Sequence, residues 1–242
     1  MFRHIVGLDH AVILVRDLDR AFETYERLGF TLTPRGHHSL GSQNHCIMLG
    51  RDYLELMALP AAPPPAFSYY AEFLSSGEGV GALALATDNA AAARAELTDA
   101  GISAEEPLAL SRPVAELGEA LFTLVQLSTD ETPGFRTFLC QHHTREIVWR
   151  PEYQRHANSA GAIRSVTIAT PDSTRYAPLF DGLPVAYANA HASAVAAIRL
   201  RVYDKEAAAD SLKRGGYSPV RLKGGVLAVG ADQTHGILLV FE

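Results

Sequence analysis

Apolar and polar positions follow one pattern four times along this chain. In each copy an apolar strand-like run leads to an Asp, then to a helical stretch of about three turns, and then to a Gly with a hydrophobic residue after it. The four copies place these residues at Asp17 and Gly29, Asp88 and Gly101, Asp172 and Gly182, and Asp204 and Gly216. An Asp at this place suits a helix N-cap, and a Gly suits the left-handed residue that ends a helix. Repetition of one unit predicts a tandem architecture.

Short strand-like runs follow three of the four predicted helices. They cover 30–33, 45–49 and 53–58 in the first copy, 103–105, 121–127 and 137–141 in the second, and 219–222, 226–229 and 237–241 in the fourth. The predicted unit is therefore β-α-β-β-β. Only about 20 residues separate Gly182 of the third copy from Asp204 of the fourth. The third unit has space for one strand, near 185–188, and is predicted to be truncated.

Two segments fall outside the repeat. Residues 59–79 begin with a proline run and then offer a short helix, predicted at 67–74. Residues 140–161 are polar and rich in His and Arg, and they form the best candidate boundary. We therefore expect an α+β protein with a first module pair at 5–150, carrying the candidate site, and a second, truncated pair at 160–242. Because strands this short cannot bury both faces alone, the first two copies are predicted to build a single curved sheet around a pocket.

Composition excludes several classes of function. The 242 residues are 48% hydrophobic and 20% charged, as in an ordinary globular protein, and the net charge of −6 offers no basic footprint for nucleic acid. No apolar run approaches the roughly 20 residues that a membrane helix needs. The N-terminus lacks the pattern of a signal peptide, and Cys46 and Cys140 form no disulfide framework. We expect a cytoplasmic protein that binds neither nucleic acid nor membrane.

The repeat and two of its segments resemble a known family. The opening LDHAVILVRDLDRAFETYERLGF, the strand DYLELMAL and the joint QHHTREIVWRPEYQRHANSA look like the glyoxalase-like branch of the vicinal oxygen chelate superfamily. That superfamily includes glyoxalase I, extradiol dioxygenases and bleomycin-resistance proteins. The resemblance implies curved mixed sheets in which paired modules form a cup, with one divalent metal held inside by the first and last strands of each module. It does not choose an activity.

The resemblance places metal ligands at His10 and Glu55. In the second module the position of His10 falls on Ala82, which cannot bind a metal. Gln141, His142 or His143 would have to complete the set, and we choose His142. These donors suit Zn, Fe, Mn, Ni or Co about equally. The plain alternative is that His10 is a strand histidine bonded to the backbone and that Glu55 is a solvated carboxylate.

Two polar segments are candidates for substrate binding. His38 and Asn44 lie on a Gly- and Ser-rich loop that would border the cup, where Arg35 and His37 would join them. Arg145 beside Trp149 would suit a planar anion. The alternatives are a solvated turn for the loop, and surface pairing with a packing anchor for Arg145 and Trp149.

Three interpretations of function remain open from the sequence. The first is a metal-dependent lyase, isomerase or dioxygenase that acts on a small oxygenated molecule. The second is a metal-free protein with the same cup that binds or sequesters a small molecule, and Ala82 favours it. A structural or regulatory dimer is a third interpretation. Because the truncated third unit would leave an open sheet edge, a homodimer is expected.

Overall fold

The computed structural model describes residues 2–114 and 117–242. The first unit comprises β1 (Ile5–Leu14), α1 (Leu18–Arg27), β2 (Gly36–His37), β3 (Gln43–Met48) and β4 (Tyr53–Ala58). The second comprises β5 (Gly79–Thr87), α3 (Ala90–Asp99), β6 (Leu108–Val114), β7 (Gly118–Gln126) and β8 (Arg136–His142). The third comprises β9 (Ala160–Thr170), α5 (Ala177–Phe180) and β10 (Val185–Asn189). The fourth comprises β11 (Ala194–Val202), α6 (Lys205–Arg214), β12 (Val220–Arg221), β13 (Leu227–Val229) and β14 (Leu238–Phe241).

The helices begin at polar caps close to the predicted positions. Asp17 and Asp204 cap α1 and α6, because the carboxylate of each accepts hydrogen bonds from backbone amides of the first turn. In the second copy the cap is Asn89 rather than the predicted Asp88, and Asn89 accepts from the amide of Ala92. Asp172 caps only a short 3-10 turn before α5. The repeat therefore sets the starts of α1, α3 and α6 to within one residue, whereas α5 begins only at Ala177 and is much shorter than the predicted three turns.

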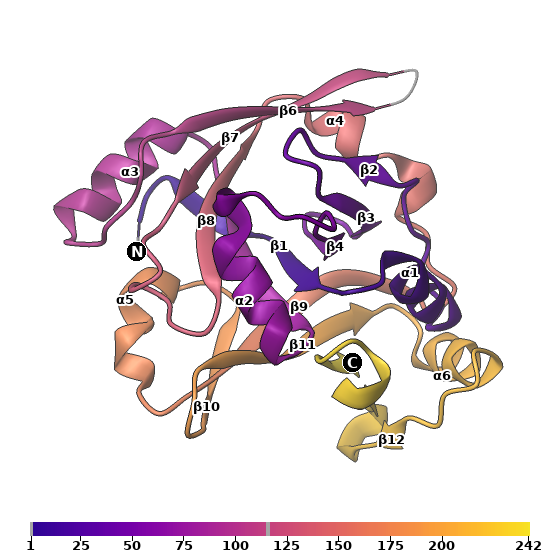
Figure 1. The fold of residues 1–242 in the computed structure, drawn as a ribbon. Coiled ribbons are helices and arrows are strands. Elements are labelled where there is room, and N and C mark those ends of the chain that lie inside the picture. The colour runs from indigo at the N-terminus through magenta and orange to yellow at the C-terminus, as the bar shows by residue number, and fades with distance from the viewer. Residues whose placement is uncertain (1, 115–116) are drawn as a thin grey trace.

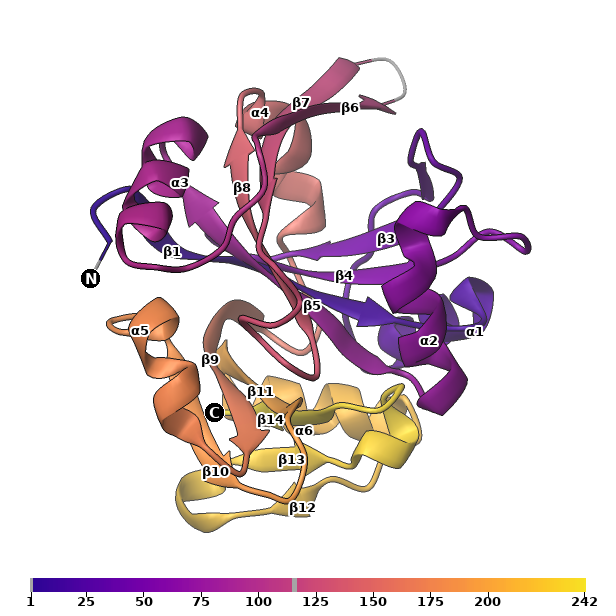
Figure 2. The ribbon, with the colours of Figure 1, turned by 60° about the vertical axis from the view of Figure 1, so that its left-hand side comes forward.

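The first two units build one curved sheet, as predicted. Its strand order is β2-β3-β4-β1-β5-β8-β7-β6, with β1 and β5 antiparallel at the centre (Figures 1 and 2). One face of the sheet packs against α1 and α3 in the main hydrophobic core, through residues such as Ala11, Ile13, Leu54 and Leu83. The opposite, concave face carries the cavity described below. The mixed α+β class with curved mixed sheets is confirmed.

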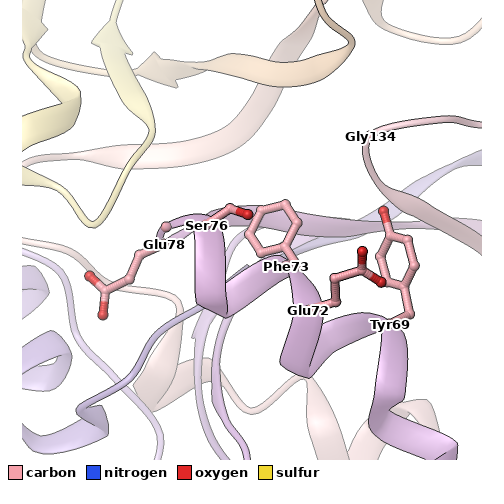
Figure 3. Close-up of a pocket in the computed structure, with 7 residues that line it drawn as sticks. Tyr69, Glu72, Phe73, Ser76, Glu78 and Gly134 are labelled. Carbon is pink, nitrogen blue, oxygen red and sulfur yellow. The ribbon is translucent and has the colours of Figure 1, made fainter.

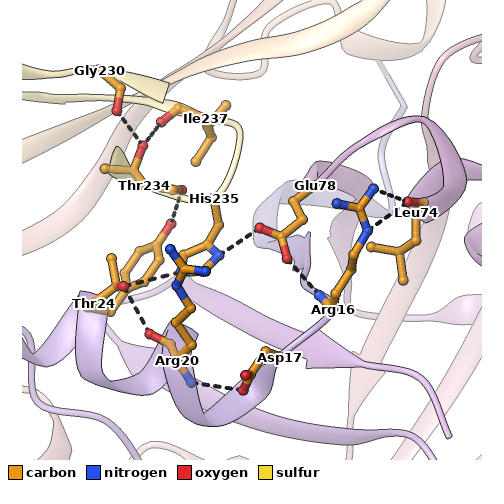
Figure 4. Close-up of polar contacts among 11 residues, drawn as sticks. Arg16, Asp17, Arg20, Thr24, Leu74, Glu78, Gly230, Thr234, His235 and Ile237 are labelled. Carbon is orange, nitrogen blue, oxygen red and sulfur yellow. Dashed lines mark hydrogen bonds and ion pairs between the residues drawn. The ribbon is translucent and has the colours of Figure 1, made fainter. Parts of the chain in front are cut away.

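The last two units form a smaller counterpart. Their strands follow the order β10-β9-β11-β14-β13-β12, and the third unit has one strand after its helix, as its length predicted. The two sheets meet at a single pairing, Val80 with Val195. Glu78 adds a polar contact, since its carboxylate accepts from the backbone N–H of Arg16 and from Nδ1 of His235, at 2.7 and 2.8 Å (Figure 4). The homodimer stays a prediction.

Three predicted elements differ from the observed ones. Residues 30–33 form no strand, because Phe30 and Leu32 turn into the core and only Thr33 reaches a neighbouring strand, with its N–H on the carbonyl of Cys46. Residues 103–105 contribute one isolated bridge, Ala104 with Leu127, while β6 lies further on, in a segment with no predicted strand. The connector helix α2 covers Ser68–Ser76, slightly later than predicted. Within the described residues, no helix is long and apolar enough to cross a membrane.

Candidate functional site

A cavity of about 550 Å³ lies on the concave face of the first sheet. Its floor comes from β1, β4 and β8, and its walls come from the segment between β2 and β3 and from the β6–β7 hairpin. Residues 65–70, which lead into α2, border the remaining side. The volume lies in the usual range for a small-molecule site. Both units of the first pair therefore line one common space.

Strand register arranges the floor residues in two rows. The first row crosses four strands, β4, β1, β5 and β8, as Tyr53, His10, Ala84 and Phe138. The second row crosses the same strands as Glu55, Val12, Ala82 and Arg136. The first unit thus contributes an imidazole and a carboxylate. The matching positions of the second unit hold Ala82 and Phe138.

A β-bulge in β1 brings a second acidic residue to the concave face. Leu8 pairs with Leu85 and His10 pairs with the next residue, Ala84. Asp9 is therefore an extra residue of β1 that has no partner on β5. Leu8 and Ala11 both pack in the core beneath the helices. Asp9 and His10 between them therefore both face the other side.

Asp9 is the centre of a buried hydrogen-bond chain. Its Oδ2 lies 2.7 Å from Nδ1 of His10 and 3.0 Å from Nε2 of His142. Burial alone would raise the pKa of Asp9, but the hydrogen bonds and charges of the two histidines hold this pKa well below its usual range. An ionised carboxylate only accepts, so both ring nitrogens donate to it. His10 is therefore fixed with its other nitrogen, Nε2, toward the cavity.

Nε2 of His10 faces the carboxylate of Glu55. The two groups are 3.5 Å apart at Nε2 and Oε2, and both side chains are buried. The ring of His10 stacks on Tyr53, with centroids 4.2 Å apart, and meets the edge of Phe138 at 5.5 Å. Aromatic packing and Asp9 together restrict the imidazole to one orientation.

The other oxygen of Glu55 faces a second imidazole. Nε2 of His38 lies 3.8 Å from Oε1 of Glu55, and Nδ1 of His38 bonds the Ser42 hydroxyl at 2.8 Å. Burial lowers the pKa of His38, which favours a neutral ring. Asn44 donates to Oε1 of Glu55 at 2.6 Å, and its amide nitrogen is 3.4 Å from Nε2 of His38. Two anchored imidazoles and one carboxylate therefore converge, with Asn44 beside them.

His10, His38 and Glu55 are the residue types of a divalent-metal site, but their ligand atoms do not all lie within 4.8 Å of one another, so the side chains would have to move closer to share one ion. Two atoms that bind one metal at about 2.1 Å lie roughly 3.0–3.4 Å apart, close to the observed separations of 3.5 and 3.8 Å. Metal-bound histidines commonly bond a carboxylate or another acceptor through the second ring nitrogen, as His10 does with Asp9 and His38 does with Ser42. His10, Glu55 and His38 would give two imidazoles and a carboxylate.

Asp9, Cys140 and His142 form another group of metal-ligating types. Their ligand atoms lie within 4.8 Å of one another, the one such trio in the described part of the chain. Burial raises the pKa of the Cys140 thiol, and Asp9 raises it further. A metal needs the thiolate, and it would have to displace N–H donors that already bond Asp9. The ligand atoms of this trio lie close together, but they are engaged in hydrogen bonds with one another.

A second cavity of about 390 Å³ lies between α2 and the segment at Gly134 (Figure 3). Tyr69 and Phe73 line it, together with Glu72 and Glu78. Glu78 is engaged with Arg16 and His235 (Figure 4). This cavity is lined by no histidine and by fewer polar residues than the cup, among the described residues.

Comparison with known proteins identifies the family. The model of the "Glyoxalase-like domain" family matches residues 8–184, which include both modules of the cup. The chain belongs to the glyoxalase-like domain family. A search of curated proteins found no match. The predicted membership of the vicinal oxygen chelate superfamily is confirmed.

Solved structures show that this glyoxalase-like protein shares its fold across the whole chain. A hypothetical protein from Staphylococcus aureus aligns with a TM-score of 0.71 at 13% identity, over 98% of each chain. An extradiol ring-cleaving dioxygenase from B. fuscum aligns with a TM-score of 0.59 at 14% identity, over 99% of this chain and 72% of that one. Homoprotocatechuate 2,3-dioxygenase from Arthrobacter globiformis gives 0.59 at 16%, over 99% and 80%. At these identities the likeness concerns the fold alone.

The sequence-predicted site residues fall into two groups in this glyoxalase-like domain. His10, Glu55, His38 and Asn44 all line the cavity. His142 lies behind His10 on Asp9, and His143 is exposed and bonds Thr123 at 2.8 Å. Arg145 stacks on Trp149 at 3.4 Å and donates to the carbonyl of Arg51. Trp149 packs against Tyr53 and His142, so neither Arg145 nor Trp149 is among the lining residues.

Asp9 and Arg136 are two polar residues of the glyoxalase-like site that the sequence did not reveal. Asp9 was missed because strict alternation along β1 places it opposite His10, and a bulge leaves no clear mark in one sequence. Arg136 begins β8 one residue before the predicted strand. Extending the alternation back from Phe138 would have placed Arg136 on the same face.

Proposed function

We propose that this protein is a metal-dependent enzyme that acts on a small oxygenated molecule, by a lyase, isomerase or dioxygenase step. His10, His38 and Glu55 would hold one divalent metal, and the bound metal would supply positive charge for an oxyanion that develops on the substrate. The cavity lies in the first module pair, 5–150, and the second pair, 160–242, would support it. The supporting observation is that Nε2 of both histidines faces the carboxylate of Glu55.

The chain's own residues would prepare the site. Asp9 holds His10 in one tautomer and supports its basicity, as a carboxylate does behind a metal-bound histidine. Asn44 orients Glu55 through the 2.6 Å hydrogen bond to Oε1. Val12, Met57 and Phe138 supply apolar surface beside the polar groups, which lowers the local dielectric and strengthens electrostatic interactions with a bound substrate.

The second candidate is a metal-free binding protein with the same cup. Two observations favour it: Ala82 and Phe138 occupy the positions that match His10 and Glu55, and the amide of Asn44 already sits between Glu55 and His38. An amide donor can bond both groups without any metal. In this interpretation the cup binds its small molecule directly.

Metal analysis separates the two candidates. Protein purified without added metal is assayed for Zn, Fe, Mn, Ni and Co, and each divalent ion is then titrated by calorimetry. We expect one ion per chain in wild type, and His10→Ala is expected to weaken its binding by more than the roughly 10–100-fold typical of losing a supporting partner. His143→Ala is the matched control, because it removes an exposed imidazole outside the cavity. Equal, weak binding by all three proteins would leave the metal-free candidate.

A further inference from the structure

Arg136 is a cation inside the cup that the proposed metal chemistry does not use. It begins β8, lines the cavity and is half-buried. Its Nη2 donates to Oε1 of Gln126 at 3.1 Å, and its guanidinium lies 5.7 Å from the ring centroid of Tyr69. Among the described residues, no carboxylate lies within ion-pair distance of it, and its buried Nε has no hydrogen-bond partner. A buried N–H of a charged group without a partner is costly.

The register places Arg136 and Glu55 on the same row of the floor. Glu55 pairs with Val12, Val12 with Ala82, and Ala82 with Arg136. Three strand spacings separate the two Cα atoms, about 14 Å along the sheet before its curvature is considered. The residues between them are apolar, and Phe138 and Met57 extend the same apolar surface. The floor therefore has two polar ends and an apolar middle.

The internal repeat explains how this asymmetry arises. Arg136 stands in the second unit where Tyr53 stands in the first, since Ala82 pairs with Arg136 as His10 pairs with Tyr53. Tyr53 stacks on the imidazole of His10. Ala82 has no ring to stack, so the side chain of Arg136 is left to face the cavity. The second unit thus offers a planar donor for an anion in place of a metal ligand.

We propose that Arg136 binds a carboxylate of the substrate, which makes the natural ligand a small organic anion with an apolar body. This inference rests on the proposed function for the reacting end of the ligand, at His10 and Glu55. A guanidinium presents N–H donors in a fork that matches the two oxygens of a carboxylate. Gln126 accepts from Nη2 and fixes the orientation of the guanidinium, and no carboxylate of the described residues neutralises its charge.

Two other charged residues line the same cavity. Arg112, on β6, borders the end near Asn44, where Gly36 leaves space for both side chains. Glu105 is exposed at the border of the cavity, and among the described residues no ion pair joins it to Arg136. Arg112 therefore serves as an internal comparison, because it is a second cation of the same cavity but lies at the end near Asn44, away from Arg136.

A matched pair of probes tests the carboxylate site. The probes are 3-phenylpropanoate and 3-phenylpropanamide, which share an apolar body and differ in charge. Binding is measured by calorimetry on chelator-treated protein, so that no metal contributes. We expect wild type to prefer the acid by about tenfold or more. Arg136→Gln is expected to remove this preference and to leave amide binding unchanged, while Arg136→Lys keeps part of it.

The controls distinguish this site from a general charge effect and from the metal site. Arg164→Gln changes an exposed arginine on β9, outside the cavity, and is expected to retain the full preference. His10→Ala is expected to lose metal binding and keep the preference, so a failed metal titration leaves the carboxylate test intact. Equal binding of acid and amide by wild type, no measurable binding of the acid, or a preference that survives in Arg136→Gln and is lost in Arg112→Gln would each overturn the proposal.

Discussion

The two sides of the cup share one backbone unit and differ in the residues that face the cavity. On the first side β1 and β4 present His10, Tyr53 and Glu55, and on the second side β5 and β8 present Ala82, Arg136 and Phe138 at the matching positions. Strand pairing, the covering helix and the core stripe are alike in both units. The repeat therefore fixes where side chains point, and the chemistry depends on which residues stand there.

The largest expected effect comes from substituting Glu55, and the matched residue of the second unit, Phe138, serves as its control. Glu55→Gln removes the carboxylate that faces both His10 and His38, so we expect divalent-metal affinity to fall by more than about 100-fold. Phe138→Leu changes the counterpart on the second side and is expected to leave that affinity within about threefold, since it removes no polar group. Calorimetric titration of both variants measures this. A similar loss in each would mean that the two sides do not differ in metal binding.

The next largest effect is expected from Asp9, whose carboxylate bonds Nδ1 of His10. Asp9→Asn keeps the shape of the side chain and replaces an acceptor-only carboxylate with an amide, so His10 loses its fixed tautomer. Metal affinity should fall by roughly 10–100-fold, and His142→Ala should have a smaller effect because it touches Asp9 and not the cavity. Both affinities are measured by the same titration, with circular dichroism to verify folding. A larger effect of His142→Ala would instead favour the trio of Asp9, Cys140 and His142 as the metal site.

Adding a histidine to the second side of the cup is expected to raise its metal affinity. Phe138 is 5.5 Å from the ring of His10 and lines the cavity, so Phe138→His places an additional imidazole on the second side. We expect metal affinity to rise by about tenfold, at a cost of about 1–3 kcal/mol in stability from the buried polar ring. Metal titration and thermal unfolding measure the two quantities. Unchanged affinity in a folded variant would show that the position does not face the metal-binding space.

The smallest expected effect concerns the contact between the two module pairs. Burial raises the pKa of Asp52 to about 6, and Oδ1 of Asp52 accepts from the N–H of Ile163 in β9 at 2.8 Å. A carboxyl whose pKa is raised on folding binds its proton more tightly in the folded protein, so its contribution favours folding at low pH and is lost as pH rises from about 4 to 6. Asp52→Asn should therefore raise stability by about 1–2 kcal/mol at pH 7.5 relative to wild type, and by little near pH 4.

Chemical unfolding at several pH values measures this difference. Asp210→Asn, an exposed substitution on α6, is the control and is expected to show no such pH dependence. A stability difference between Asp52→Asn and wild type that stays constant from pH 4 to 7.5 would contradict the raised pKa of Asp52.

The sequence was sufficient for the repeated elements and for part of the site. Helix caps, core stripes and the short third unit follow from local patterns that the tertiary structure preserves. His10, Glu55, His38 and Asn44 were placed at the cup, through the family resemblance or a loop pattern, and all four line the cavity. The absence of a strand at 30–33 was not predictable, because Phe30 and Leu32 are buried as they would be in a strand but without a partner strand.

The residues that sequence reasoning misplaced depend on side-chain contacts across strands. His142 shares the concave face, yet Asp9 stands between it and the cavity, and only the bulge in β1 puts Asp9 there. Arg145 and Trp149 do stack, but on the outer side of Tyr53. Arg136 depends on register across three strands. Local patterns in one sequence do not encode such pairings.

Anomalous X-ray diffraction from a crystal soaked with Co²⁺ or Mn²⁺ tests the central claim most directly. We expect one strong anomalous peak in the cup, bonded to Nε2 of His10, Nε2 of His38 and the carboxylate of Glu55, with no peak beside Ala82 or Phe138. A peak at Asp9, Cys140 and His142, or a cup without any peak in crystals that bind the ion elsewhere, would contradict it.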